Sequence, residues 1–288
     1  MLYLFLAVIC ASTYSILFKL FACRDVDSLQ AIAFNYLTAT LLGILLSLGD
    51  MSGGLVLGWR EWGLSAIMGV MFMVAFVLMA RSTAVSGVAV TTVAARVALI
   101  IPVVLSYLFI ERSVAPRWGA IAVIIVALVL VIWQPNQGAK GESKRAGTLG
   151  TILLPALVFL LFGANNFCLN WARSGLDAPG AAAQLSAAIF AFAALSGCAY
   201  YLIVSKKRRF SWVALGGGVA LGVANFFTTY FMILGLEMLP SGVFFPIYHV
   251  GIVALVATIG VALFGERLSR VQLVGLAIAA VGIVAFFV

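Results

Sequence analysis

The sequence predicts an all-α integral membrane protein with ten transmembrane helices, arranged as two inverted repeats of five helices each. Composition, the length of the apolar runs and an internal repeat predict this class. The chain has 288 residues, of which 65% are hydrophobic and 9% are charged, and its mean hydropathy is +1.21. Soluble domains are about half apolar and about a quarter charged, so lipid is the expected solvent of this chain.

The apolar runs are continuous and long enough to cross a bilayer as helices. A helix needs about 20 apolar residues to span a hydrocarbon core of ~30 Å, and only helices and closed barrels satisfy every backbone group in lipid. The runs do not show the alternation of barrel strands. In chain order, the expected helices cover residues 2–22, 28–48, 61–80, 86–110, 116–133, 148–170, 180–204, 211–235, 241–264 and 268–288.

Polar or turn-forming stretches separate these helices, at residues 24–27, 49–54, 115–116, 177–180 and 206–209. The first apolar run starts at Met1 and lacks both a basic segment and a small-residue cleavage site, so we expect a retained helix instead of a signal peptide. The four cysteines have neither CxxC nor metal-ligand spacing. We therefore expect no metal, no cofactor and no redox role for them.

One segment of the chain occurs twice. The first copy starts at Ser86 and reaches Glu111, and the second starts at Ser241 and reaches Glu266, a separation of 25 positions in both copies (86 to 111, and 241 to 266). Each copy predicts a hairpin of two apolar helices with a Glu-Arg pair at the bend. The polar linker 134–147 then separates a first repeat, residues 1–133, from a second, residues 148–288.

Five helices per half is an odd number, so the second half must enter the membrane from the opposite side. Inverted repeats of this kind are typical of secondary transporters, whose substrate sites lie near the bilayer midplane between the repeats. We expect the site between helices 1, 3 and 4 of the first half and their counterparts 6, 8 and 9.

The hairpins resemble the drug/metabolite transporter superfamily of the EamA type. The second copy reads Phe264-Gly265-Glu266-Arg267-Leu268-Ser269, followed by Gln272, Gly275 and Gly282; the first copy has Ile110 in place of the glycine and Ser113 in place of the leucine. The resemblance implies ten helices in two inverted repeats and transport of metabolites, with export of amino acids among the family's activities. In many members both termini are cytoplasmic.

The positively charged residues favour the opposite orientation. With both termini in the cytoplasm, four Lys and Arg side chains would lie in cytoplasmic loops and eleven on the other side, whereas cytoplasmic loops normally carry the excess. The orientation therefore stays open. The net charge of +8 is expected to lie at the membrane surface and not to bind nucleic acid. The Glu-Arg bends lie at helix ends, where a carboxylate can cap or pair locally, so we expect them to be structural.

Arg96 is the ionisable residue placed most deeply in an expected helix. A charge at bilayer depth is costly and is a functional hypothesis by default. Arg96 could bind a carboxylate or phosphate through its bidentate guanidinium, with Thr92 one turn earlier on the same face. The alternative is an arginine held by backbone carbonyls in a broken helix.

His249, the single histidine of the chain, follows Tyr248 in the ninth expected helix. It could bind substrate or carry a coupling proton, because the unperturbed pKa of histidine is close to physiological pH; alternatively it is a neutral histidine bound to a carbonyl. Other polar residues of the helices either join helices together or face a wet cavity. Those that we expect at the substrate site are Asn165, Asn166, Tyr14, Asn225 and Tyr248.

No carboxylate lies deep in an expected helix, and no nucleotide-binding loop is present. Cation exchange through a buried carboxylate and ATP hydrolysis are therefore disfavoured. We expect a secondary transporter, not an enzyme, that moves a small polar metabolite by alternating access, and the best substrate class is an amino acid or related carboxylate. The alternatives are an exporter of drugs or cationic metabolites, and a channel or lipid-handling protein. A multi-pass protein of a bacterial-type cytoplasmic membrane is expected.

Overall fold

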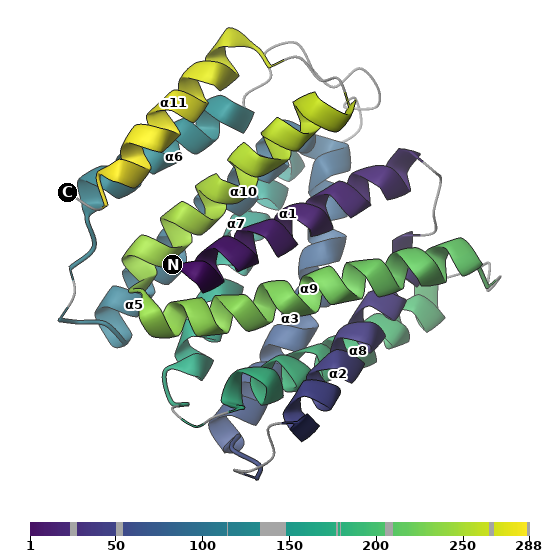
Figure 1. Cartoon of the computed structure of the whole chain (residues 1–288). Helices are drawn as coiled ribbons and strands as arrows, with labels where there is room; N and C mark the ends of the chain where they lie inside the picture. The colour runs from purple at the N-terminus through teal and green to yellow at the C-terminus, as the bar shows by residue number, and fades with distance from the viewer. Residues whose placement is uncertain are drawn as a thin grey trace. The chain divides into compact units, whose positions relative to one another are not determined.

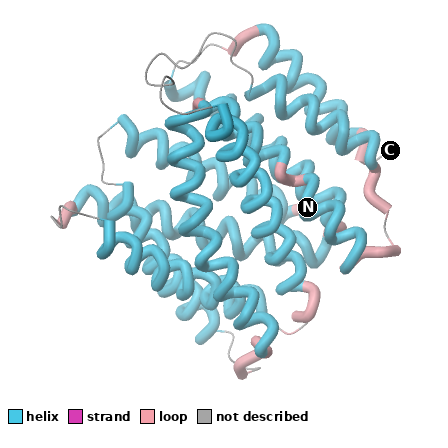
Figure 2. The backbone as a smooth tube through the Cα atoms, turned by 180° about the vertical axis from the view of Figure 1, so that it is seen from behind, coloured by secondary structure: helices cyan, strands magenta, loops and turns pink. Residues whose placement is uncertain are grey.

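The computed structural model describes residues 1–23, 28–49, 54–113, 115–132, 148–176, 178, 180–204, 210–264 and 268–286. Their regular structure is helical throughout (Figures 1 and 2). The helices are α1 (Leu2–Cys23), α2 (Ser28–Gly49), α3 (Trp59–Ser86), α4 (Val88–Val97), α5 (Ile100–Phe109), α6 (Trp118–Ile132), α7 (Thr148–Arg173), α8 (Ala181–Val204), α9 (Trp212–Met238), α10 (Ser241–Phe264) and α11 (Arg270–Val284).

The helices confirm a multi-pass membrane protein. Among the described residues, seven segments are long and apolar enough to cross a bilayer, and three shorter apolar helical segments, Leu2–Tyr14, Trp118–Ile132 and Arg270–Val284, accompany them. One of the seven segments, Val90–Phe109, consists of α4 and α5 together. The ten expected helices are thus present, with ends that differ from the expected ones by a few residues.

The prediction of one continuous helix over residues 86–110 is wrong. The helix is interrupted at Ala98 and Leu99, between α4 and α5. Pro102 accounts for the break, because its ring lacks an N–H and clashes with the carbonyl four residues earlier, that of Ala98. The N–H of Leu99 instead donates to the carbonyl of Arg96, at 3.3 Å, so the break begins directly after the turn that carries Arg96.

The contacts divide the chain into two compact units. Unit 1 comprises Met1–Met73 and Cys168–Met238, and unit 2 comprises Val74–Phe167 and Leu239–Val288. Each unit combines residues from both halves of the sequence, and α3 and α7 pass from one unit into the other. The assignment of residues 1–133 and 148–288 to inverted repeats stays a prediction.

Several features singled out in the sequence lie outside the described residues. They are the linker 134–147, the Glu266-Arg267 pair of the second bend, and the helix boundaries at 24–27 and 206–209.

In unit 1, α2 packs against α8 and α9, and α1 packs against α9 (Figure 1). Glycines make the contact between α2 and α9 close: a Cβ atom at Gly218 would lie 2.6 Å from the carbonyl oxygen of Ala31, and one at Gly222 would lie 2.6 Å from that of Asn35. In lipid, helices associate through packing of this kind because the hydrophobic effect does not drive them together. The small residues of α9 therefore set the separation of these helices.

In unit 2, α11 lies along α6, and α10 packs against α5 and α6 (Figure 1). Ser269 begins α11 with a capping box, in which its hydroxyl accepts from the N–H of Gln272 and its own N–H donates to the Gln272 side chain. The Nε2 of Gln272 also donates to the carbonyl of Val131 in α6, at 3.1 Å. One glutamine thus fixes both the start of α11 and its position on α6.

Candidate functional site

Unit 2 contains most of the side chains that we expected at a substrate site. They are Thr92 and Arg96 on α4, Asn165 and Asn166 on α7, and Tyr248 and His249 on α10. The other two expected residues, Tyr14 on α1 and Asn225 on α9, belong to unit 1. The candidate site is therefore the polar set of unit 2, named the cluster of unit 2 below, and within it Arg96 and His249 lie in electrostatic range of each other.

Arg96 lies in the last turn of α4, within the candidate membrane span Val90–Phe109. Ala98 and Leu99, which follow α4, keep right-handed helical backbone angles, and the carbonyl of Arg96 accepts from the N–H of Leu99. The interruption is therefore a local change of hydrogen bonding directly after Arg96. Arg96 also interacts electrostatically with His249, so the two residues that we singled out separately in the sequence are neighbours.

His249 is buried in α10, with 3% of its surface exposed. Among the described residues, neither of its ring nitrogens has a hydrogen-bond partner. Its ring lies 5.3 Å from that of Tyr248, which in turn stacks on Phe244 at 5.7 Å. A buried polar group without a partner costs about 1–3 kcal/mol and is rare in folded proteins. The fold therefore holds a costly imidazole in an aromatic environment, beside a guanidinium.

Asn165 provides a third polar group without a partner. Its Oδ1 atom is buried and accepts no hydrogen bond from the described residues, and Asn166 beside it is half-buried. Two residues earlier, Gly163 lets α7 approach α5 so closely that an added Cβ would lie 2.6 Å from the Cβ of Ile101. This contact holds Asn165 within one turn of the place where α7 meets α5.

The start of α4 is also fixed by its sequence. Gly87 precedes the helix with a φ of 87°, which a residue with a Cβ rarely adopts. One turn further on, the buried hydroxyl of Thr91 bonds to the hydroxyl of Ser82 in α3 at 2.7 Å. Thr92 is half-buried and lies one turn before Arg96. The segment that carries Arg96 is therefore anchored at its first turn and interrupted after its last.

Asn225 has a partner outside this cluster. Its Nδ2 donates to the Oδ1 of Asn35 on α2, at 3.2 Å, and Asn35 is 2% exposed. An amide pair of this kind joins α2 to α9 within unit 1. Tyr14 interacts electrostatically with Tyr36 of α2 in the same unit. Both residues thus interact with α2 within unit 1.

The described residues contain no group of three or more His, Cys, Asp or Glu side chains that could hold a metal ion. The cluster of unit 2 is therefore built from one guanidinium, one imidazole, amides and hydroxyls. Such groups can bind an anionic or neutral polar molecule through hydrogen bonds and charge.

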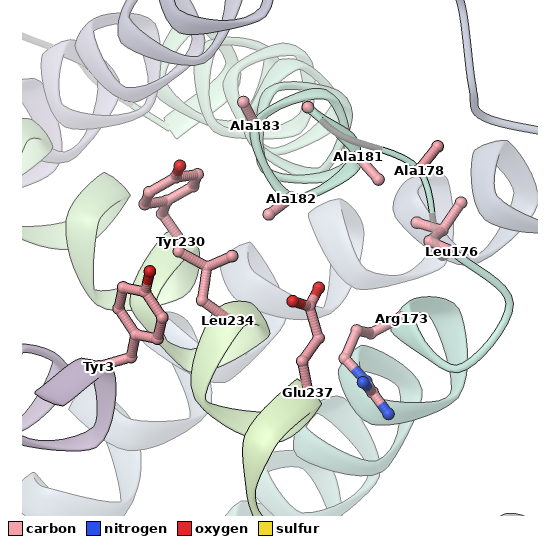
Figure 3. A pocket seen from close by; sticks show the side chains of 11 residues that line it. Tyr3, Arg173, Leu176, Ala178, Ala181, Ala182, Ala183, Tyr230, Leu234 and Glu237 are labelled. Atoms are coloured by element: carbon pink, nitrogen blue, oxygen red, sulfur yellow. The ribbon is translucent and has the colours of Figure 1, made fainter. Parts of the chain in front are cut away.

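Sequence reasoning missed a cavity in unit 1 of about 520 Å³, which Arg173 and Glu237 line together (Figure 3). Both lie at the ends of expected helices, where charged residues are common and carry no special information. The cavity becomes visible only once the helices are packed.

Comparisons with known proteins support the fold. No family model matches the chain. An uncharacterized protein of Haemophilus influenzae is 23% identical over 283 residues, covering 95% of this chain and 93% of that protein. A solved crystal structure matches with a TM-score of 0.77 and 14% sequence identity, covering 99% of this chain and 95% of the other. The full-length structural match shows that the arrangement of the helices has a counterpart of known structure.

Proposed function

We propose that this protein is a secondary transporter that moves a small polar metabolite across the membrane by alternating access, with an amino acid or related carboxylate as the best substrate class. The observation that carries the proposal is that Arg96 and His249, each inside a candidate membrane span, lie within electrostatic range of each other. Charged and polar groups at this depth are costly, and they mark substrate pathways in membrane proteins. The resemblance of the hairpins to EamA-type transporters supports the same function.

In this proposal Arg96 binds the carboxylate of the substrate. The guanidinium can donate two parallel hydrogen bonds to a carboxylate, and its place in the last turn of α4, before the break, gives it a fixed position. The interrupted backbone also resembles the discontinuous helices at which transporters bind their substrates.

His249 and Asn165 have complementary roles. The imidazole offers one donor and one acceptor when neutral, and the Oδ1 of Asn165 offers a further acceptor. Each of these atoms is buried and has no hydrogen-bond partner among the residues described. A polar substrate that forms hydrogen bonds with them would remove the free-energy cost of leaving them unpaired. A proton is the coupling ion that His249 could carry.

Counterflow in proteoliposomes tests the proposal. Purified protein is reconstituted into liposomes that are loaded with an unlabelled amino acid or carboxylate. The same compound, labelled, is added outside, and its entry into the liposomes is measured. We expect wild type to accumulate label transiently, and Arg96→Ala to raise the apparent KM at least about tenfold, since loss of one charge-assisted hydrogen bond costs about 1.5–3 kcal/mol. Arg96→Lys should fall between the two because it keeps the charge and loses the bidentate geometry.

Arg81→Ala is the matched control, because Arg81 is an exposed arginine of α3 in the same unit. Its transport should equal that of wild type. Counterflow by Arg96→Ala with an unchanged apparent KM would exclude the binding role of Arg96. Rapid dissipative flux without counterflow would instead identify a channel.

A further inference from the structure

Two buried glutamines of unit 1 each hold the backbone of a segment that leads into a helix. The Nε2 of Gln184, in the first turn of α8, donates to the carbonyl of Gly54 at 2.8 Å, and its Oε1 accepts from the N–H of Val56 at 2.9 Å. Both partners belong to residues 54–59, which lead into α3. A side-chain amide that donates to and accepts from one stretch of backbone fixes it at two points. Gln184 therefore clamps this segment to the start of α8.

Gln30 has a similar role at the start of α2. Its Oε1 accepts from the N–H of Ser211 at 2.8 Å, and its Nε2 donates to the hydroxyl of Tyr201 in α8 at 3.0 Å. Ser211 belongs to residues 210–212, which lead into α9, and its hydroxyl accepts from the N–H of Ala214 at 3.3 Å. Since α2 and α8 are the second helices of the two predicted repeats, such a clamp occurs once in each.

The two clamped segments lie at opposite ends of the packed helices α2 and α8 (Figure 1). A Cβ atom at Gly43, in the second half of α2, would lie 2.7 Å from Ala187, in the first half of α8. Conversely, one at Gly197, late in α8, would lie 3.0 Å from the ring of Tyr36. The helices are thus antiparallel. The 22 residues of α2 extend over about 33 Å at a rise of ~1.5 Å per residue, close to the ~30 Å of a hydrocarbon core.

Each clamped segment exposes large apolar side chains. Leu55 and Trp59 are 86% and 89% exposed, and at the other end Phe210 and Trp212 are 55% and 77% exposed. Both tryptophans are the first residues of candidate membrane spans, so these side chains continue the lipid-facing surface of the spans at its edge. Tryptophan is enriched at this level of a bilayer, because its ring is apolar and its N–H is polar.

We propose that the two clamped segments are membrane-interface anchors, which bind the headgroup regions of the two leaflets and set the depth of unit 1 in the bilayer. Trp59 anchors one end and Trp212 the other. The buried amides of Gln184 and Gln30 keep the backbone of each anchor in place, so that its side chains stay at the level of the interface. These anchors depend neither on a substrate nor on transport.

Fluorescence quenching of the full-length protein in liposomes tests the anchors. Two variants keep a single tryptophan each, Trp59 or Trp212, and carry phenylalanine at the other tryptophan positions. The lipid is phosphatidylcholine brominated either near the headgroup or near the ends of the acyl chains. Bromines near the headgroup should quench both tryptophans at least about twofold more strongly, since interfacial side chains lie within about 5–10 Å of the headgroup boundary.

Leu41→Trp, in a background without other tryptophans, is the control for depth. Leu41 is exposed and lies well inside α2, so bromines near the ends of the acyl chains should quench it more strongly. The anchors are excluded if Trp59 and Trp212 behave like this control. They are also excluded if iodide in the water quenches both as strongly as it quenches free N-acetyltryptophanamide.

The two glutamines provide a reciprocal test. Gln184→Ala should raise the quenching of Trp59 by iodide at least about twofold and leave Trp212 unchanged, because loss of a clamp loosens the backbone locally. Gln30→Ala should do the reverse. In each variant the unchanged tryptophan shows that the fold is retained. The role of the glutamines is overturned if either variant changes both tryptophans equally, or changes neither.

Discussion

The carboxylate of Glu111 accepts hydrogen bonds from both the backbone and the side chain of Ser241, the first residue of α10. Its Oε2 lies 2.9 Å from the Ser241 nitrogen and 2.8 Å from the Ser241 hydroxyl oxygen, and Oε1 lies 3.2 Å from the same nitrogen. The first N–H groups of a helix lack partners within it, and its N-terminus attracts negative charge. The Glu-Arg bend of the first hairpin therefore caps a helix of the second half, within unit 2.

Removal of this cap should destabilise unit 2. We expect Glu111→Ala to lower the free energy of unfolding by about 1–2 kcal/mol, the usual effect of losing a side-chain cap. Glu111→Gln should lose less, because its amide oxygen still accepts from Ser241. Unfolding in mixed detergent micelles measures both. Arg112→Ala is the control, because the Nε of Arg112 donates to the carbonyl of Leu108, four residues earlier in the chain; an equal loss there would contradict a role specific to Glu111.

The close contact of α2 and α9 predicts opposite effects for two neighbouring glycines. A methyl group at Gly218 would meet the backbone of Ala31 at 2.6 Å, whereas one at Gly216 would meet nothing within 4 Å. Gly218→Ala should therefore cost about 1–3 kcal/mol through overpacking, and Gly216→Ala should be neutral or slightly stabilising, since alanine has the higher helix propensity. Comparison of the two melting curves checks this, and equal curves would show that α9 does not pack on α2 in this register.

The hydrogen bond between Asn35 and Asn225 should appear as a coupling energy. Interhelical hydrogen bonds in membrane proteins contribute about 0.6 kcal/mol on average and up to about 1.7. The stabilities of Asn35→Ala, Asn225→Ala and the double variant form a cycle that isolates this term. Additive losses would mean that the two amides do not act together, and would return Asn225 to the set of substrate-binding candidates.

Replacement of His249 should abolish transport without lowering the thermal stability of the protein. Both ring nitrogens are buried, and within the described chain they have no hydrogen-bond partner. His249→Leu should therefore leave the melting temperature unchanged or raise it, because an apolar side chain of similar size avoids the cost of the unpaired nitrogens, while counterflow is lost. A clear drop in stability of His249→Leu would show that the imidazole supports the fold.

The sequence predicted the number and limits of the helices well, because long apolar runs and polar breaks are properties of the chain itself. It also contained a signal for the interruption at Ala98 and Leu99, which our prediction missed. Pro102 lies in the predicted helix 86–110, and its effect on the carbonyl of Ala98 is known for any helix. Whether a helix is interrupted at a proline or continues through it, as at Pro246 inside α10, depends on the surrounding packing.

The candidate site was predicted in part. The cost of charge in lipid singled out Arg96, and the single histidine was conspicuous, yet nothing in their spacing showed that they are neighbours. The same argument could not separate Asn165, which lacks a partner at Oδ1, from Asn225, which is bonded to Asn35. An amide looks alike in sequence whether it joins two helices or faces a ligand, because its partner lies far away in the chain.

The composition of the two units has a consequence for how the protein is made. Unit 1 needs residues up to Met238, and unit 2 needs residues from Leu239 onward. During synthesis, the helices of the first half must therefore remain in the bilayer with the faces that pack on α8 and α9 uncovered until those helices emerge from the ribosome. Unit 1 can then close first, and α10 and α11 complete unit 2 after it.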